Sequence, residues 1–132
     1  MKVPKNVKKL VTALRSGKYT QTQEHLRRGD SFCCLGVACD ISKLGKWEKD
    51  EEGDYLYLEN EGTLPPDVIT WLGPFWTNSG FTTTTFVNEF GHEVHSVSLM
   101  HENDINRTSF EEIADMIEWF YLYALEENNV KP

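Results

Sequence analysis

The stretch that decides the fold spans residues 32–40 and reads Phe32-Cys33-Cys34-Leu35-Gly36-Val37-Ala38-Cys39-Asp40. It carries no charge before its last residue, and its apolar side chains cover most of a helical circumference. This pattern predicts a buried helix from residue 32 to residue 44, ended by Gly45. Because two of the three cysteines are adjacent, they favour buried free thiols in a reducing compartment over a disulfide framework.

Helical patterns also occur on both sides of this stretch. Residues 4–16 repeat apolar side chains at helical spacing, and a shorter helix is predicted over residues 64–72, opened by prolines. The clearest pattern starts at Ser109, which is followed three residues later by Glu112, as in a capping box. We expect this last helix to extend to about residue 126.

Short β-prone segments lie between these helices. They comprise residues 55–58, the β-branched run at 82–86, and residues 94–100 beyond a turn at 88–91. The sequence therefore predicts an α+β fold, with a small antiparallel sheet packed with about four helices. Residues 1–132 are expected to form a single domain, since a chain of this length suffices for one core.

The charge is unevenly distributed along the chain. The net charge is −8, which argues against a partner such as a DNA or RNA polymer. Residues 1–30 nevertheless carry +6, which leaves −14 on the remainder. Such asymmetry suits the steering of a small anion or the association of two copies, although solvated charge also clusters by chance. The chain has no apolar run of about 20 residues and no secretory signal, so we expect no membrane partner and a location in the bacterial cytosol.

No motif points to catalysis or to a bound metal. His92 and His95 are three residues apart in a predicted strand, where their imidazoles would face opposite sides, unlike the helical pair of a zinc protease. The cysteine spacing differs from that of zinc knuckles, and phosphate-binding loops and nucleophile elbows are absent. The acidic loop at residues 50–54 is better explained as a solvated surface loop than as a pair of catalytic acid and base residues. We therefore expect no catalytic residue, no metal and no cofactor.

A binding pocket is the remaining kind of site. Aromatic side chains gather between residues 71 and 90, and several of them flank Gly, Pro or Asn. Each could either pack in the core or stack on a nucleobase. Arginines beside helix starts are suited to phosphate oxygens, although the acids of the last helix's first turn compete for the same positive end. The candidate ligand-binding residues are Phe75, Trp76, Phe81 and Phe86 for stacking, Arg28 and Arg107 for phosphates, and Asn88 for base or ribose edges.

Three blocks of the sequence resemble a family of small bacteriophage and prophage proteins. They are ALRSGKYTQ (13–21) leading to GDSFCCLGVACD (29–40), LPPDV (64–68) with WLG (71–73), and ND (103–104) followed by SFEEIADMIE (109–118). The family looks like the Thoeris anti-defence sponges. That resemblance implies a non-enzymatic oligomer that holds cyclic ADP-ribose isomers, and in some members cyclic oligonucleotides, and so removes the TIR-domain alarm signal. Residues 75–100 depart most from the pattern, so no pocket residue there is taken from the resemblance.

Three hypotheses follow. The first is a sponge for a cyclic nucleotide, acting as a homo-oligomer without catalysis. The second is an enzyme that degrades the same signal through a carboxylate or the His92/His95 pair. The third is a protein-binding inhibitor of a host defence component, whose acidic body imitates a charged partner.

Overall fold

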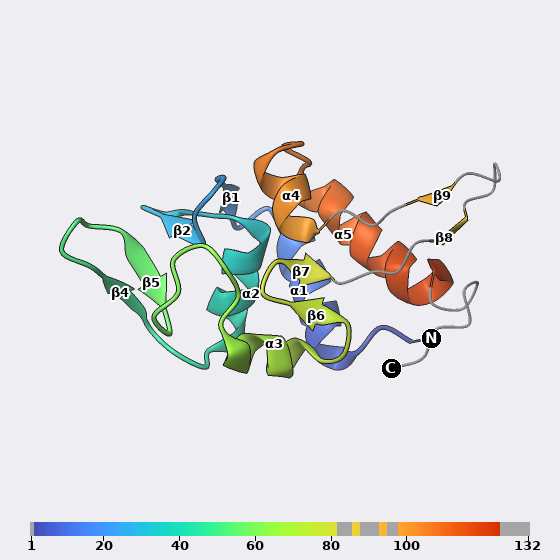
Figure 1. Ribbon diagram of the computed structural model, residues 1–132, viewed down its shortest axis with the longest axis horizontal. Helices are drawn as coiled ribbons and strands as arrows, with labels where there is room; N and C mark the ends of the chain where they lie inside the picture. The colour runs from blue at the N-terminus through green and yellow to red at the C-terminus, as the bar shows by residue number, and fades with distance from the viewer. Residues whose placement is uncertain (1, 82–85, 88–92, 95–97, 125–132) are drawn as a thin grey trace.

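The computed structural model of the chain describes residues 2–81, 86–87, 93–94 and 98–124 (Figure 1). Its helices are α1 (Lys5–Arg15), α2 (Cys34–Ser42), α3 (Pro66–Leu72), α4 (Leu99–Asp104), α5 (Phe110–Trp119) and the π-helix η1 (Phe120–Ala124). Its strands are β1 (Thr20–Gln21), β2 (Arg27–Arg28), β3 (Ser31–Phe32), β4 (Trp47–Lys49), β5 (Tyr55–Tyr57), β6 (Trp76–Thr77), β7 (Gly80–Phe81), β8 (Phe86–Val87) and β9 (Glu93–Val94). The fold is α+β, as predicted.

Helix α2 lies at the centre of the core. All its residues from Cys34 to Cys39 are buried, and the helix packs against α1, α3 and α4. Gly36 is required by a close backbone approach, since a Cβ atom at this position would lie 1.7 Å from the carbonyl oxygen of Leu26. Cys33 caps the helix, because its Sγ atom accepts a hydrogen bond from the Gly36 N–H at 3.3 Å. The apolar stretch therefore forms the predicted helix over residues 34–42, whereas Phe32, expected at its start, lies in strand β3.

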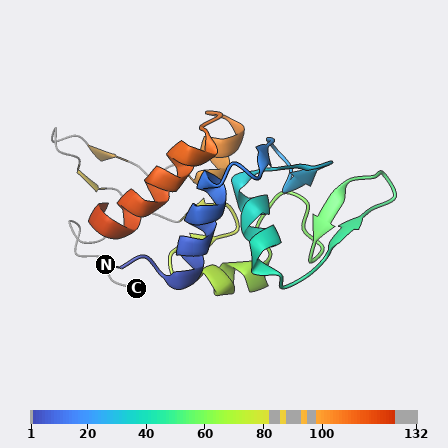
Figure 2. The same ribbon diagram turned by 180° about the vertical axis from the view of Figure 1, so that it is seen from behind.

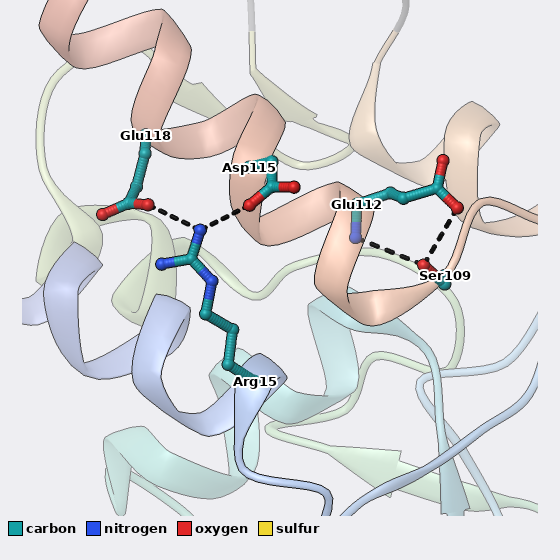
Figure 3. Close-up of polar contacts among 5 residues, drawn as sticks. All are labelled: Arg15, Ser109, Glu112, Asp115 and Glu118. Atoms are coloured by element: carbon teal, nitrogen blue, oxygen red, sulfur yellow. Dashed lines mark hydrogen bonds and ion pairs between the residues drawn. The ribbon is translucent and has the colours of Figure 1, made fainter.

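Helix α1 lies between α2 and α5 (Figure 2). Its apolar stripe of Val7, Leu10, Val11 and Leu14 is buried. At the end of the helix, the Arg15 guanidinium lies 2.5 Å from Asp115 and 2.6 Å from Glu118, both on α5 (Figure 3). The chain's basic first helix is thus joined to its acidic last helix.

The start of α5 is capped as the sequence predicts. The Oγ atom of Ser109 accepts a hydrogen bond from the Glu112 N–H and lies 3.2 Å from that residue's carboxylate (Figure 3). The α-helix ends at Trp119 and continues as the π-helix η1 to Ala124, while residues 125–126 of the expected helix lie outside the described residues.

The strands form separate small sheets instead of one antiparallel sheet. One sheet has the order β1-β3-β2, in which β1 runs parallel to β3, and β4–β5, β6–β7 and β8–β9 are antiparallel pairs. Strands of two or three residues offer few ladder hydrogen bonds, so none of these sheets is large. The β4–β5 hairpin projects from the helices at one end of the molecule (Figure 1).

The strand predicted over residues 94–100 is wrong at its C-terminal end. Leu99 and Met100 were expected to continue a strand from residue 94, but they begin helix α4. Ser98 caps this helix, since its side chain accepts a hydrogen bond from the His101 N–H at 3.1 Å. A buried side chain then holds the helix in place: the Asn103 carboxamide bonds the Cys34 N–H, Gln21 and the Thr22 carbonyl. The predicted turn at residues 88–91 lies outside the described residues.

Candidate functional site

A groove of about 490 Å³ runs beside α1 on its solvent side. Basic, hydroxyl and apolar side chains from three segments line it: Lys8, Lys9, Thr12, Ala13, Ser16, Lys18, Tyr19 and Ile41. Small-molecule sites in proteins commonly have volumes of about 300–1,000 Å³. The groove therefore has the size of a site for a ligand no larger than a nucleotide or a dinucleotide.

The amphipathic pattern of α1 explains why the lysines lie here. The apolar stripe turns inward, which leaves Lys8 and Lys9 exposed on the opposite side. The helix ends at Arg15 and is capped by Ser16, whose Oγ atom donates to the Ala13 carbonyl at 2.6 Å and accepts from the Lys18 N–H at 3.2 Å. Gly17 adopts a φ of +76°, which glycine tolerates without strain, and the chain turns so that Lys18 returns to the groove.

Tyr19 forms an aromatic wall of the groove and is held in place. Its hydroxyl donates a hydrogen bond of 2.5 Å to Asp40, and the Trp47 indole N–H donates to the other oxygen of the same carboxylate at 3.0 Å. Its ring meets the ring of Phe32 edge-on, with centroids 5.1 Å apart. Burial and the Asp40 hydrogen bond raise the pKa of the Tyr19 hydroxyl, so this group remains a donor at physiological pH.

The electrostatics of the groove are positive. Lys8, Lys9 and Lys18 are exposed, and none of them forms an ion pair with another described residue. Arg15 differs, because hydrogen bonds to Glu118 and Asp115 occupy its guanidinium and raise its pKa. A second hollow of about 540 Å³ beside it shares Lys8 with the groove but also includes Glu118, whose carboxylate disfavours an anion there. The anion-binding capacity of this surface therefore lies on the Lys8, Lys9 and Lys18 side.

Two of the predicted aromatic residues, Phe75 and Trp76, lie elsewhere and are engaged in packing. Trp76 in β6 is 5% exposed, and its indole N–H donates to the Tyr121 hydroxyl at 2.9 Å. Phe75 is partly buried, and its ring meets that of Phe120 edge-on at 5.8 Å. Neither residue lines the groove on α1. Their use in ligand binding stays a prediction, and the burial of Trp76 leaves little of its ring accessible to a ligand.

The two predicted arginines are not brought together with the groove either. Arg28 in β2 and Arg107, which has a φ of +52° between α4 and α5, are both exposed, and neither lines the groove. Phe81 lies in β7, and Phe86 lies in β8. Asn88 is outside the described residues, as are the two histidines at 92 and 95, so the predictions for them stay untested.

The cysteines are free and buried, which confirms their predicted packing role. Burial raises the pKa of the Cys33 thiol to about 12, although the Gly36 N–H opposes this shift, and burial raises the pKa of Cys34 and Cys39 as well. All three thiols therefore stay protonated at neutral pH. A protonated, enclosed thiol is a poor nucleophile and a poor metal ligand.

Residues 2–120 match a family described as a domain of unknown function (DUF8296). The chain belongs to this family. No curated protein and no solved structure matches it. Among the described residues of this family member, no helix has both the length and the apolar character needed to cross a bilayer.

The part of the chain that defines the family membership includes every residue of the groove on α1. Sequence reasoning missed Lys8, Lys9, Lys18, Tyr19 and Ile41 as site residues. A signal for the lysines was present in the +6 charge of residues 1–30. Nothing in the pattern indicated that Ile41, from the far end of the cysteine-rich helix, would form the other side of the groove.

Proposed function

We propose that this protein binds a small anionic nucleotide without converting it, and thereby sequesters a cyclic nucleotide signal. The ligand class we favour is a cyclic ADP-ribose isomer, with cyclic oligonucleotides as a second class, and the setting is phage anti-defence in the bacterial cytosol. The observation that carries the proposal is the groove on α1, where Lys8, Lys9 and Lys18 accompany the ring of Tyr19.

The groove offers the two kinds of contact that such a ligand needs. Lysine ammonium groups form charge-assisted hydrogen bonds with phosphate oxygens, each contributing about 1.5–3 kcal/mol. A nucleobase stacked on an aromatic ring contributes about 1–3 kcal/mol. Nanomolar affinity corresponds to about −12 kcal/mol, which several such contacts reach only if the ligand also buries apolar surface. Ala13 and Ile41 supply that apolar surface within the groove.

The chemistry of the lining favours holding the ligand over cleaving it. The groove's described polar groups are ammonium groups, aliphatic hydroxyls and a tyrosine hydroxyl that is already bonded to Asp40. An ammonium group binds phosphate but has no lone pair with which to accept a proton from water. An enzyme that degrades the same signal is the alternative, and the mass of the recovered ligand separates the two.

Self-association is part of the proposal. The exposed side of α1 is basic, the exposed side of α5 is acidic, and the two helices pack against each other (Figure 2). A two-fold axis that relates two copies of the chain would set the basic helix of each copy on the acidic helix of the other. Such an interface is self-complementary. Sedimentation velocity should then show a dimer that dissociates as salt is raised, and a monomer at low salt would count against it.

A protein partner is the second candidate, and one observation favours it. Met116, Trp119 and Leu122 on α5 and η1 have exposed fractions of 39%, 42% and 39%. Side chains of this size are exposed together mainly where a protein surface contacts another molecule. This candidate predicts that host proteins bind the chain in the absence of any nucleotide.

Isothermal titration calorimetry against cyclic ADP-ribose isomers and cyclic di- and trinucleotides tests the proposal. The bound ligand is then released by heating and weighed by mass spectrometry. We expect tight binding to one ligand class and an unchanged ligand mass. A changed mass would make the protein an enzyme, and the absence of heat across the panel would leave the protein-partner candidate.

A further inference from the structure

A second cluster of ligand-capable side chains lies apart from the groove. It consists of His25, Asp54 and Glu61, whose donor atoms all lie within 4.8 Å of one another. The His25 Nδ1 atom is 3.2 Å from a Glu61 carboxylate oxygen. None of the three residues lines the groove on α1. The cluster therefore calls for an explanation other than nucleotide binding.

The three side chains come from separate segments that the backbone fixes together. Beside His25, the Leu26 N–H donates to the Glu61 carbonyl at 2.9 Å, which joins the β1–β2 connection to the segment after β5. Asp54 is held by Asp50, whose N–H donates to the Asp54 carbonyl and whose carboxylate accepts from the Asp54 N–H, both at 2.9 Å. Strand β2 also contacts β5. The arrangement of the three ligands is thus set by the fold.

We propose that His25, Asp54 and Glu61 form a binding site for a divalent transition-metal ion, of which zinc is the representative. One imidazole nitrogen with two carboxylates is a donor set that suits zinc and its neighbours. Ligands about 2.1 Å from a tetrahedral zinc ion lie about 3.4 Å apart, which the His25–Glu61 spacing already approaches. The two carboxylates balance the charge of the ion, and water fills the remaining position.

An acidic turn next to this site is a different kind of cluster. Asp50, Glu52 and Asp54 also lie close together, but they come from one continuous loop. The Asp50 carboxylate there already accepts hydrogen bonds from the Glu52 and Asp54 N–H groups at 2.8 and 2.9 Å. This pattern is that of a solvated turn. It lacks the nitrogen donor that distinguishes the His25 site.

The expected consequence of metal binding is structural. Asp54 precedes β5 in the projecting β4–β5 hairpin, whereas His25 precedes β2 (Figure 1). An ion bound to both would fasten the hairpin to the β1-β3-β2 sheet. Hydrogen exchange of residues 47–57 should therefore slow on addition of zinc, since metal bound to the folded state suppresses local opening.

The test is calorimetric titration of the full chain with zinc ions alone, without nucleotide. We expect 1:1 binding that weakens at least about tenfold in His25→Gln and in Glu61→Gln, as loss of a ligand does in metal sites. Glu52→Gln and His101→Gln serve as matched controls that retain wild-type affinity. Cobalt substitution gives a second readout, because Co²⁺ absorbs strongly in the visible in a four-coordinate protein site and weakly when hydrated, so the bands should weaken in His25→Gln.

Two outcomes would overturn the proposal. One is the absence of zinc and cobalt binding by the wild-type chain. The other is binding that His25→Gln and Glu61→Gln leave unchanged while their melting temperatures match the wild type. Neither outcome bears on the groove, since no nucleotide is present in these experiments.

Discussion

Helices α1 and α2 pack against each other in the same core, but they expose very different amounts of surface. In α2, six consecutive residues from Cys34 to Cys39 are buried, so every side of that part of the helix contacts protein. In α1, only the stripe of Val7, Leu10, Val11 and Leu14 is buried, and the opposite side carries the lysines of the groove. The comparison indicates that α2 is central to the fold, whereas α1 packs in the core with one side and lines the groove with the other.

The largest expected effect is on the α2 side. Gly36→Ala would place a Cβ atom 1.7 Å from the Leu26 carbonyl oxygen, and a backbone atom cannot move aside as a flexible side chain can. We expect a loss of more than about 3 kcal/mol in the free energy of unfolding, measured by urea denaturation. Gly62→Ala is the control, because its nearest neighbour lies at 3.5 Å, and it should change stability by less than about 1 kcal/mol. Equal stability of the two variants would contradict the packing described for α2.

The buried thiols of α2 and of its N-cap residue predict that the free energy of unfolding depends on pH. Their pKa values are raised in the folded state by burial, whereas thiols in the unfolded chain titrate at about 8.5. Stability is therefore fully present below that pH and is lost as the pH rises, because only the unfolded state releases protons. Between about pH 7.5 and pH 9, three such thiols lower the free energy of unfolding by about 2 kcal/mol.

Urea denaturation at several pH values checks this expectation. The variant Cys39→Ala should show a shallower decline with pH than the wild type, whatever its stability at neutral pH. A decline of the same slope in both proteins would mean that Cys39 is not held protonated by burial.

On the α1 side, two substitutions of Tyr19 distinguish its contribution to stability from its proposed contribution to ligand binding. Tyr19→Phe removes the hydrogen bond to Asp40 and should cost about 1 kcal/mol of stability, while the ring and hence the nucleotide affinity remain. Tyr19→Leu removes the aromatic face, and the affinity should fall about 5- to 100-fold. Calorimetry of both variants distinguishes the roles. If Tyr19→Leu bound as tightly as Tyr19→Phe, stacking on this ring would be excluded.

The smallest effect concerns the bridge between α1 and α5. Arg15 is paired with Asp115 and Glu118 at a partly exposed position, so Arg15→Gln should cost only about 0.5 kcal/mol (Figure 3). Thermal melts at low and high salt give the measurement, and the difference between the two proteins should shrink with salt. Nucleotide affinity should change little, since Arg15 does not line the groove. A large loss of affinity in Arg15→Gln would move the site toward the second hollow.

Sequence patterns predicted the helices well where periodicity and caps coincide. The helix at 34–42, the helix at 5–15 and the Ser109 cap all follow from local spacing. Helix α4 was missed because its six residues are too few to establish a helical period, and only the capping Ser98 marked its start. The separate small sheets were also missed, since strand pairing depends on contacts between distant segments.

The candidate site was harder to predict than the fold. Aromatic content drew attention to residues 71–90, but Trp76 is in the core there, bonded to Tyr121 from the other end of the chain. Tyr19 received no weight, because its role depends on Asp40, Phe32 and Trp47 holding its ring beside α1. Composition shows which side chains are present, whereas tertiary packing decides which of them remain accessible to a ligand.

The most direct test of the account compares the removal of three lysine charges inside the groove with the removal of three outside it. One variant carries Lys8→Gln, Lys9→Gln and Lys18→Gln, and the matched control carries Lys2→Gln, Lys5→Gln and Lys46→Gln, which changes the net charge equally at exposed lysines that do not line the groove. Calorimetry with the best cyclic nucleotide should show at least about a 30-fold loss of affinity in the first variant, about 2 kcal/mol. The control should stay within about threefold of the wild type. Equal losses in both variants, or none in either, would contradict the assignment of the nucleotide to the groove on α1.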